Sequence, residues 1–153
     1  MSQQEQDAQG FMLNTVEDAT IVPHSDLALG AFAEKIYQSR RERDKKFQVQ
    51  ALFQDPAWDI LLDLFISHVG NKNISVMSAG LAGQVPPSTA LRWIWALEEA
   101  KLVERRADKN DKRRSFVLLT AEGLSHMRDL LTSMSDRLQP RFCEASSLDN
   151  PTV

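Results

Sequence analysis

Residues 88–123, STALRWIWALEEAKLVERRADKNDKRRSFVLLTAEG, decide the fold of this chain. The first part predicts a helix over 88–101, because apolar residues recur at helical spacing and supply a buried face of Ala90, Ile94 and Leu97. Two strand-like stretches, 102–107 and 115–119, follow on either side of a polar loop. This arrangement predicts an antiparallel hairpin.

Two further helices are expected before this segment. Asp55 and Pro56 predict the start of the first, since Asp caps a helix and Pro suits its first position, and Gly70 marks its end. Its expected core face consists of Trp58, Leu61, Leu62, Phe65, Ile66 and Val69. The second is a short helix that ends near Ala82 and is capped by Ser75 or Ser78.

The order of these elements predicts the fold class. Residues 74–76 are too short for more than a β-bridge, and the two prolines at 86 and 87 predict a turn after the short helix. Helix, short helix, proline turn, helix and hairpin together form a winged helix-turn-helix. We therefore expect a mainly α fold with a small β-hairpin over 26–140, with a mobile arm over 1–25 and a disordered tail over 141–153.

Longer helices flank the helix-turn-helix on both sides. The first is expected over 26–47 with Asp26 as its N-cap, and the second starts after Thr120. In the second, apolar residues repeat at 3,4,3,4 spacing, which is typical of a helix packed along another helix. This apolar material exceeds what one small domain buries, so we expect a two-fold homodimer with an interface formed by Leu29, Phe32, Ile36, Leu124, Met127, Leu131, Met134 and Leu138.

Composition excludes several classes of protein. No apolar run approaches the length of a membrane span, and the single cysteine, Cys143, excludes an internal disulfide framework. We therefore expect a cytoplasmic protein without membrane association. The sequence contains no phosphate-binding loop, nucleophile motif, paired-carboxylate motif or metal-ligand cluster. Neither an enzyme nor a metal or cofactor site is expected.

Basic residues are concentrated in two short stretches, although the net charge is −3. Residues 1–34 contain six acidic residues and no Lys or Arg, whereas 35–47 and 105–114 each contain six basic residues. Local potential, not net charge, attracts phosphate groups. The first stretch matches no motif, and its bases at 40–46 are expected to be solvated helix surface. The second stretch includes the predicted hairpin loop.

Both the last helix of the helix-turn-helix and the hairpin carry side chains suited to double-stranded DNA. Such a helix enters the major groove while the hairpin lies over the neighbouring backbone. Arg92 is expected to bind guanine and Leu91 to pack on a thymine methyl group. Trp95 is left exposed by the helical pattern, which favours either packing on sugar and phosphate or a protein interface. The full set of expected DNA-binding residues is Ser88, Thr89, Leu91, Arg92, Trp95, Lys109, Asp111, Lys112, Arg113 and Arg114.

The stretch 88–123 resembles the recognition helix and wing of MarR-type transcriptional regulators. These proteins show a Ser-Thr-x-x-Arg helix start, then Leu-Glu, Leu-Val-x-Arg, Asp-x-x-Asp-x-Arg and Leu-Thr-x-x-Gly. The matching residues are Ser88-Thr89 with Arg92, Leu97-Glu98, Leu102-Val103 with Arg105, Asp108 with Asp111 and Arg113, and Leu119-Thr120 with Gly123. Two positions depart from the pattern: Lys101 stands where the family has Gly, and Pro140 leaves little room for a further C-terminal helix.

The resemblance implies a bacterial, homodimeric regulator. Two recognition helices one DNA turn apart imply an operator that is an inverted repeat. Many such proteins are released from DNA by a small, often aromatic acid or phenol. In the family the wing Asp holds the wing Arg, which enters the minor groove, and this role carries over to Asp111 and Arg113.

A protein-interaction module built on the same fold is the alternative. The exposed Leu91 and Trp95, the acidic N-terminal arm and the net negative charge favour it. Arg92 and the arginine-rich wing favour DNA.

Overall fold

The computed structural model describes residues 24–48 and 52–138 of the chain. His24 and Ser25 already belong to the first helix, and the rest of the expected arm, the expected tail and Pro140 lie outside these ranges. Within them the chain forms α1 (His24–Phe47), α2 (Pro56–Val69), β1 (Ile74–Ser75), α3 (Val76–Ala82), α4 (Pro87–Glu99), β2 (Val103–Ala107), β3 (Ser115–Leu119) and α5 (Ala121–Leu138).

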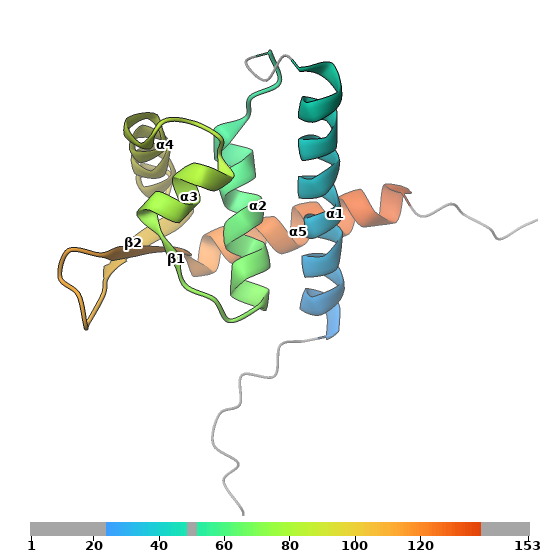
Figure 1. The fold of residues 1–153 in the computed structure, drawn as a ribbon. Coiled ribbons are helices and arrows are strands. Elements are labelled where there is room, and N and C mark those ends of the chain that lie inside the picture. The colour runs from blue at the N-terminus through green and yellow to red at the C-terminus, as the bar shows by residue number, and fades with distance from the viewer. Residues whose placement is uncertain (1–23, 49–51, 139–153) are drawn as a thin grey trace, which may run out of the picture.

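The winged helix-turn-helix expected from the sequence, and from the resemblance to MarR-type regulators, is confirmed. The helices α3 and α4 and the hairpin of β2 and β3 lie on one side of α2, and α1 lies on the other (Figure 1). The helix α4 begins at Pro87, so the prediction that this proline belongs to the preceding turn was wrong. Proline is accepted at the first helical position because its missing N–H has no partner there.

The hairpin is part of a three-stranded antiparallel sheet with the order β1-β3-β2. Val117 of β3 lies opposite Arg105 of β2 on one side and Ile74 of β1 on the other. The expected β-bridge at 74–76 is a strand of two residues, and it adds a third strand to the predicted hairpin. A strand of two residues is too short to show an alternating pattern in the sequence.

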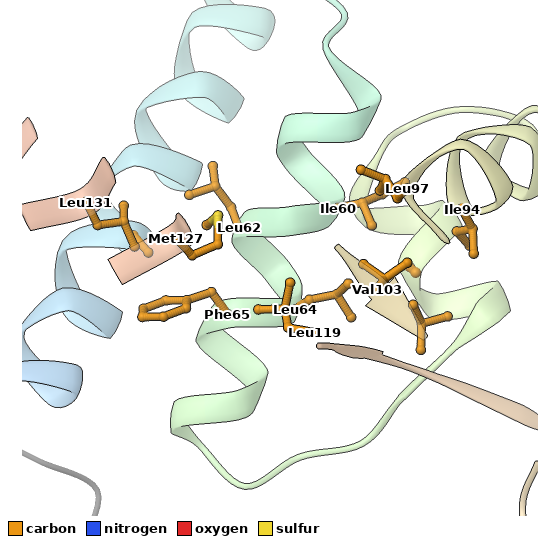
Figure 2. Packing of buried hydrophobic residues seen from close by; sticks show 13 residues of the cluster. Ile60, Leu62, Leu64, Phe65, Ile94, Leu97, Val103, Leu119, Met127 and Leu131 are labelled. Carbon is orange, nitrogen blue, oxygen red and sulfur yellow. The ribbon is translucent and has the colours of Figure 1, made fainter. Parts of the chain in front are cut away.

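The helix α2 is buried on two sides. It contacts α1 and α5 on one side and α3, α4 and β3 on the other. Of the predicted core face, Leu62 and Phe65 are fully buried, but the four remaining residues are only half-buried. Ile60 and Leu64, which were not predicted, are buried as well, and Figure 2 shows labelled side chains leaving α2 towards both sides.

Close packing fixes the angle between α3 and α4. The Ser75 hydroxyl caps α3, as predicted, by accepting the N–H of Ser78 at 3.1 Å. Gly80 of α3 faces Ala90 of α4, and a Cβ built on Gly80 would lie 2.9 Å from the Ala90 Cβ. A larger residue at position 80 would push the two helices apart and would move the exposed face of α4.

The start of α5 is tied to the end of α4. The Thr120 hydroxyl accepts the N–H of Gly123 at 3.0 Å, which confirms the predicted cap, and donates to the Lys101 carbonyl at 2.6 Å. Gly123 lies directly against the Leu102 backbone, where a Cβ would collide with the carbonyl oxygen. The Leu-Thr-x-x-Gly motif therefore serves a close approach between two backbone segments.

The basic stretch at 40–46 is not simply solvated surface, and that prediction was wrong for its arginines. Asp59 is buried on α2 and accepts hydrogen bonds from Arg40 and from Arg41, the latter at 2.6 Å. Arg41 also lies over the Tyr37 ring, 5.0 Å from its centroid. Arg43 donates to Asp44 and to the Phe53 carbonyl. These residues hold α1 against α2.

Asp26 is not the N-cap of α1, because the helix begins two residues earlier at His24. Its side chain is buried and accepts two hydrogen bonds from the Arg128 guanidinium of α5, at 2.8 and 2.6 Å. The bonds from Arg128 lower the pKa of Asp26 below its ordinary value, against the opposing effect of burial. This ion pair joins the two ends of the described chain.

No helix in the two described ranges is long and apolar enough to cross a membrane. In the same ranges, no three His, Cys, Asp or Glu side chains come together in a way that could hold a metal ion.

Candidate nucleic-acid interface

The outward face of α4 carries the residues that the sequence singled out. Ala90, Ile94 and Leu97 are buried, as predicted, and they orient the helix. The opposite face leaves Ser88 and Arg92 exposed, Thr89 and Leu91 half-buried, and Trp95 with 53% of its surface exposed. The outward face of α4 therefore presents one cation, Arg92, between the apolar side chains of Leu91 and Trp95.

The hairpin loop between β2 and β3 is a compact turn built by two aspartates. Asp108 Oδ1 accepts the N–H of Asn110, and Asp111 Oδ1 accepts the N–H of Arg113, both at 2.9 Å. Two backbone bonds, from Asp108 to the Arg114 carbonyl and from Arg114 to the Asp111 carbonyl, close the turn. Asp111 thus holds the backbone of Arg113, and the guanidinium remains exposed.

The basic residues of 105–114 fall into two groups. On the strand, Arg105 and Arg106 form ion pairs with Glu98 and Glu104. In the loop the cations form no ion pair with any part of the chain that the structure describes, and they are all exposed: Lys109, Lys112, Arg113 and Arg114. The positive potential of the wing therefore comes from its loop.

A groove of about 420 Å³ lies between α3, α4 and the base of the wing. Its apolar lining comes from Val76, Met77, Pro87 and Leu91, and its cationic edge comes from Arg113 and Arg114. The groove brings the first turns of α4 and two wing arginines, predicted separately from the sequence, to one surface. Lys109, Lys112 and Trp95 do not line it.

Met77 is one of the groove residues that the sequence did not predict. It lies on α3 with 72% of its surface exposed, and it lines the groove opposite Leu91. A methionine in a seven-residue helix gives no periodic signal that separates a core residue from a surface residue. The contacts of α3 with α2, α4 and the sheet determine which side of the short helix faces outward.

The eight residues expected at a dimer interface fall into three groups. Met127 and Leu131 belong to the core of the single chain, so they are not available to a partner. Half-buried and packed against that core are Leu29, Phe32, Ile36 and Leu124. Met134 is half-buried and Leu138 is exposed. Leu130, which was not predicted, is also exposed on α5 and forms a stripe with Met134 and Leu138 at i, i+4 spacing.

A second groove, of about 310 Å³, lies on the other side of the sheet. It is bounded by the end of α2, by β1, β2 and β3, and by the start of α5. Leu64, Leu119 and Leu124 supply apolar lining. The charged and basic groups are His68, Lys72 and the ion pair of Arg106 with Glu104.

Comparison with known proteins gives distant matches only. No protein-family model matches the chain, and no curated protein matches it. Among solved structures, MepR of S. aureus in its DNA-binding conformation is 22% identical with a TM-score of 0.49, over 70% of this chain and 75% of that chain. A protein of Archaeoglobus fulgidus is 22% identical with a TM-score of 0.48, over 61% of this chain and 98% of that one. The S. aureus MepR–DNA complex is 19% identical with a TM-score of 0.47, over 67% and 82% of the two chains.

No conclusion on function follows from matches this distant.

Proposed function

We propose that this chain is a DNA-binding transcriptional regulator that reads a specific sequence of double-stranded DNA. One observation carries the proposal: Arg92 on α4 and the unpaired wing cations are exposed, and two of these cations share a groove with the start of α4. A helix of this kind fits the major groove, and Arg pairs in bidentate fashion with the O6 and N7 of guanine. The proposed activity is binding and release of DNA in the cytoplasm, without catalysis.

The wing supplies affinity in this proposal and α4 supplies specificity. Exposed Lys and Arg side chains in a loop neutralise phosphates whatever the sequence. Asp111 stabilises the backbone turn of the loop through its bond to the Arg113 N–H, and the turn carries the exposed cations. Insertion of Arg113 into the minor groove, as the resemblance implies, is part of the proposal.

We infer further that the regulator is a homodimer. The stripe of Leu130, Met134 and Leu138 supports this, because it is apolar and residues 24–48 and 52–138 leave much of it uncovered. A two-fold dimer places two α4 helices about one DNA turn, roughly 34 Å, apart. The expected operator is therefore an inverted repeat.

The second groove, next to the sheet, supports the proposal of an effector. Its volume is at the lower end of the range for small-molecule sites, about 300–1,000 Å³. Arg106 is already paired with the Glu104 carboxylate in this groove, whereas Lys72 forms no ion pair with the described residues. Apolar walls with Lys72 beside them suit a small aromatic carboxylate. Calorimetric titration with benzoate tests this: heat of binding that is lost in Lys72→Ala supports the site, and equal binding by both proteins contradicts it.

Selection of DNA from a random duplex library tests the proposed function. The proposal expects one enriched sequence with two inverted half-sites. The alternative of a protein-interaction module expects no enrichment, because its exposed Leu91 and Trp95 would then face a protein. Repeating the selection with Arg92→Ala separates the roles of α4 and of the wing: the enriched sequence should lose a guanine position but retain binding.

A further inference from the structure

The surface that faces DNA in the proposed function is unusually apolar. The side chains of Trp95 on α4 and Met77 on α3 are more than half exposed to solvent. Leu91 on α4 is half-buried. Leu91 and Met77 line one groove, and Trp95 follows Leu91 by one helical turn. Arg92 is the one charged side chain of α4 beside these residues. Leu91 and Trp95 therefore place apolar surface next to Arg92 on α4.

Base pairs offer one kind of apolar group in the major groove, the C5 methyl of thymine. The other groups by which base pairs differ on this edge are hydrogen-bond donors and acceptors, and the C–H groups of cytosine and the purines offer much less apolar surface than a methyl group. An apolar side chain placed over a guanine or cytosine edge would strip water from polar groups without replacing their hydrogen bonds, which is unfavourable. An apolar reading surface consequently favours thymine-rich sequence.

We propose that Leu91, Trp95 and Met77 form a thymine-methyl reading surface, so that the preferred half-site has thymines beside the guanine bound by Arg92. The inference rests on the proposed function and specifies the sequence class that the protein binds. The charge distribution agrees with this assignment, because Arg113 and Arg114 stand at the edge of the same groove. Their guanidinium groups suit the phosphates that border the bases. An apolar floor with a cationic edge fits a nucleotide strand.

Deoxyuridine provides the test, because it lacks only the methyl group of thymine. The probe is the duplex enriched from the random library, with each thymine of one half-site replaced in turn by deoxyuridine. We expect a loss of affinity of about fourfold for each methyl group that is buried on binding. In Leu91→Ala and Trp95→Ala the loss at the corresponding thymine should shrink to nearly nothing, since the partner of the methyl group is gone.

Matched controls keep the result interpretable. Leu52→Ala also removes an exposed leucine, but from the segment before α2, and should retain the full deoxyuridine effect. Thermal melting of each variant shows whether it is folded. Leu91 is half-buried, so Trp95→Ala and Met77→Ala, which remove more exposed side chains, carry the test if Leu91→Ala melts early.

The outcomes separate this inference from the proposed function. Specific binding that no deoxyuridine substitution weakens would overturn the inference and leave the proposed function intact. If the alanine variants also bound the duplex like the wild type, the apolar surface would face a protein instead of DNA. Failure of the wild type to bind any duplex would overturn both.

Discussion

Arg105 of β2 binds Glu98 of α4 through its Nε, which lies 2.9 Å from each carboxylate oxygen. The pair connects the wing to the helix that is proposed to read DNA. It also gives a structural reason for the Leu-Glu and Leu-Val-x-Arg motifs, because Glu98 and Arg105 are the polar residues of those motifs. The pair therefore favours one position of α4 relative to the wing before DNA binds.

Breaking the Glu98–Arg105 pair should weaken DNA binding more than it weakens the fold. The side chains are 25% and 39% exposed, so the expected change in the free energy of unfolding is below about 1 kcal/mol. A double-mutant cycle of Glu98→Gln and Arg105→Gln, read as operator affinity, should show a coupling energy of about 0.5–1 kcal/mol. The neighbouring pair Glu104 and Arg106, within one strand, is the matched control and should show no coupling. Equal coupling in both pairs would refute the role given to Glu98.

Replacing Arg92 by Ala should cost about 1–3 kcal/mol of specific binding and relax the preference at one base pair per half-site. The reason is its exposed position on α4, with no carboxylate partner among the described residues. Affinities for single-base variants of the enriched duplex measure the effect, and Lys46→Ala on α1 serves as the control. An unchanged base preference would exclude Arg92 from the reading surface.

Replacing Arg113 by Ala should weaken binding to all sequences and leave the major-groove preference nearly unchanged. A wing arginine contacts phosphates and recognises the width of the minor groove, and it does not contact base edges in the major groove. The slope of log affinity against log salt should fall by about one for each lost phosphate contact. If neither affinity nor slope changes, the wing does not touch DNA.

Replacing Asp26 by Asn should destabilise the protein by about 1–2 kcal/mol at neutral pH, a range that allows for the partial exposure of Arg128. The folded-state pKa of Asp26 is lowered, so its contribution is present above the unfolded-state pKa, near 3.9, and is lost as the pH falls below it. Urea unfolding of both proteins at several pH values should therefore show a difference that narrows below about pH 4. A difference that persists unchanged into strong acid would contradict the assigned ion pair.

Charged residues on the exposed stripe of α5 should produce monomers. Leu130→Glu with Leu138→Glu places charge on exposed positions, whereas a charge at Leu131 would enter the core and unfold the chain. Sedimentation at micromolar concentration should change from dimer to monomer, and affinity for the inverted repeat should fall because each half-site is then bound alone. Leu52→Glu is the control. A wild-type protein that sediments as a monomer would show that α5 does not support a dimer.

Local signals in the sequence predicted most of the helix-turn-helix. Asp55 and Pro56 mark the start of α2, and the side chain of Asp55 accepts the Trp58 N–H as expected. The buried face of α4 was predicted correctly, because this helix packs against the core on one side only. Lys101 adopts a φ of 60°, a left-handed conformation that explains why the related pattern has Gly there.

Contacts between distant residues could not be predicted in the same way. The partners Asp26 and Arg128 are 102 positions apart, and nothing periodic connects them. Asp59 is buried in an apolar helix and binds Arg40. The sequence around Arg40 is a run of charged residues, which predicts solvated surface instead. The seam of α5 was visible, but spacing alone does not tell whether Leu131 meets its own chain or a partner. Each of these questions depends on tertiary packing.

The salt dependence of DNA affinity tests the central claim most directly. The measurement is fluorescence anisotropy of the wild-type protein with the enriched duplex, about 30 base pairs long so that both half-sites fit. The account predicts a linear fall of log affinity with log salt, and six phosphate contacts would give a loss of about three orders of magnitude between roughly 50 and 200 mM. No binding at the lowest salt, or an affinity that does not respond to salt, would contradict it.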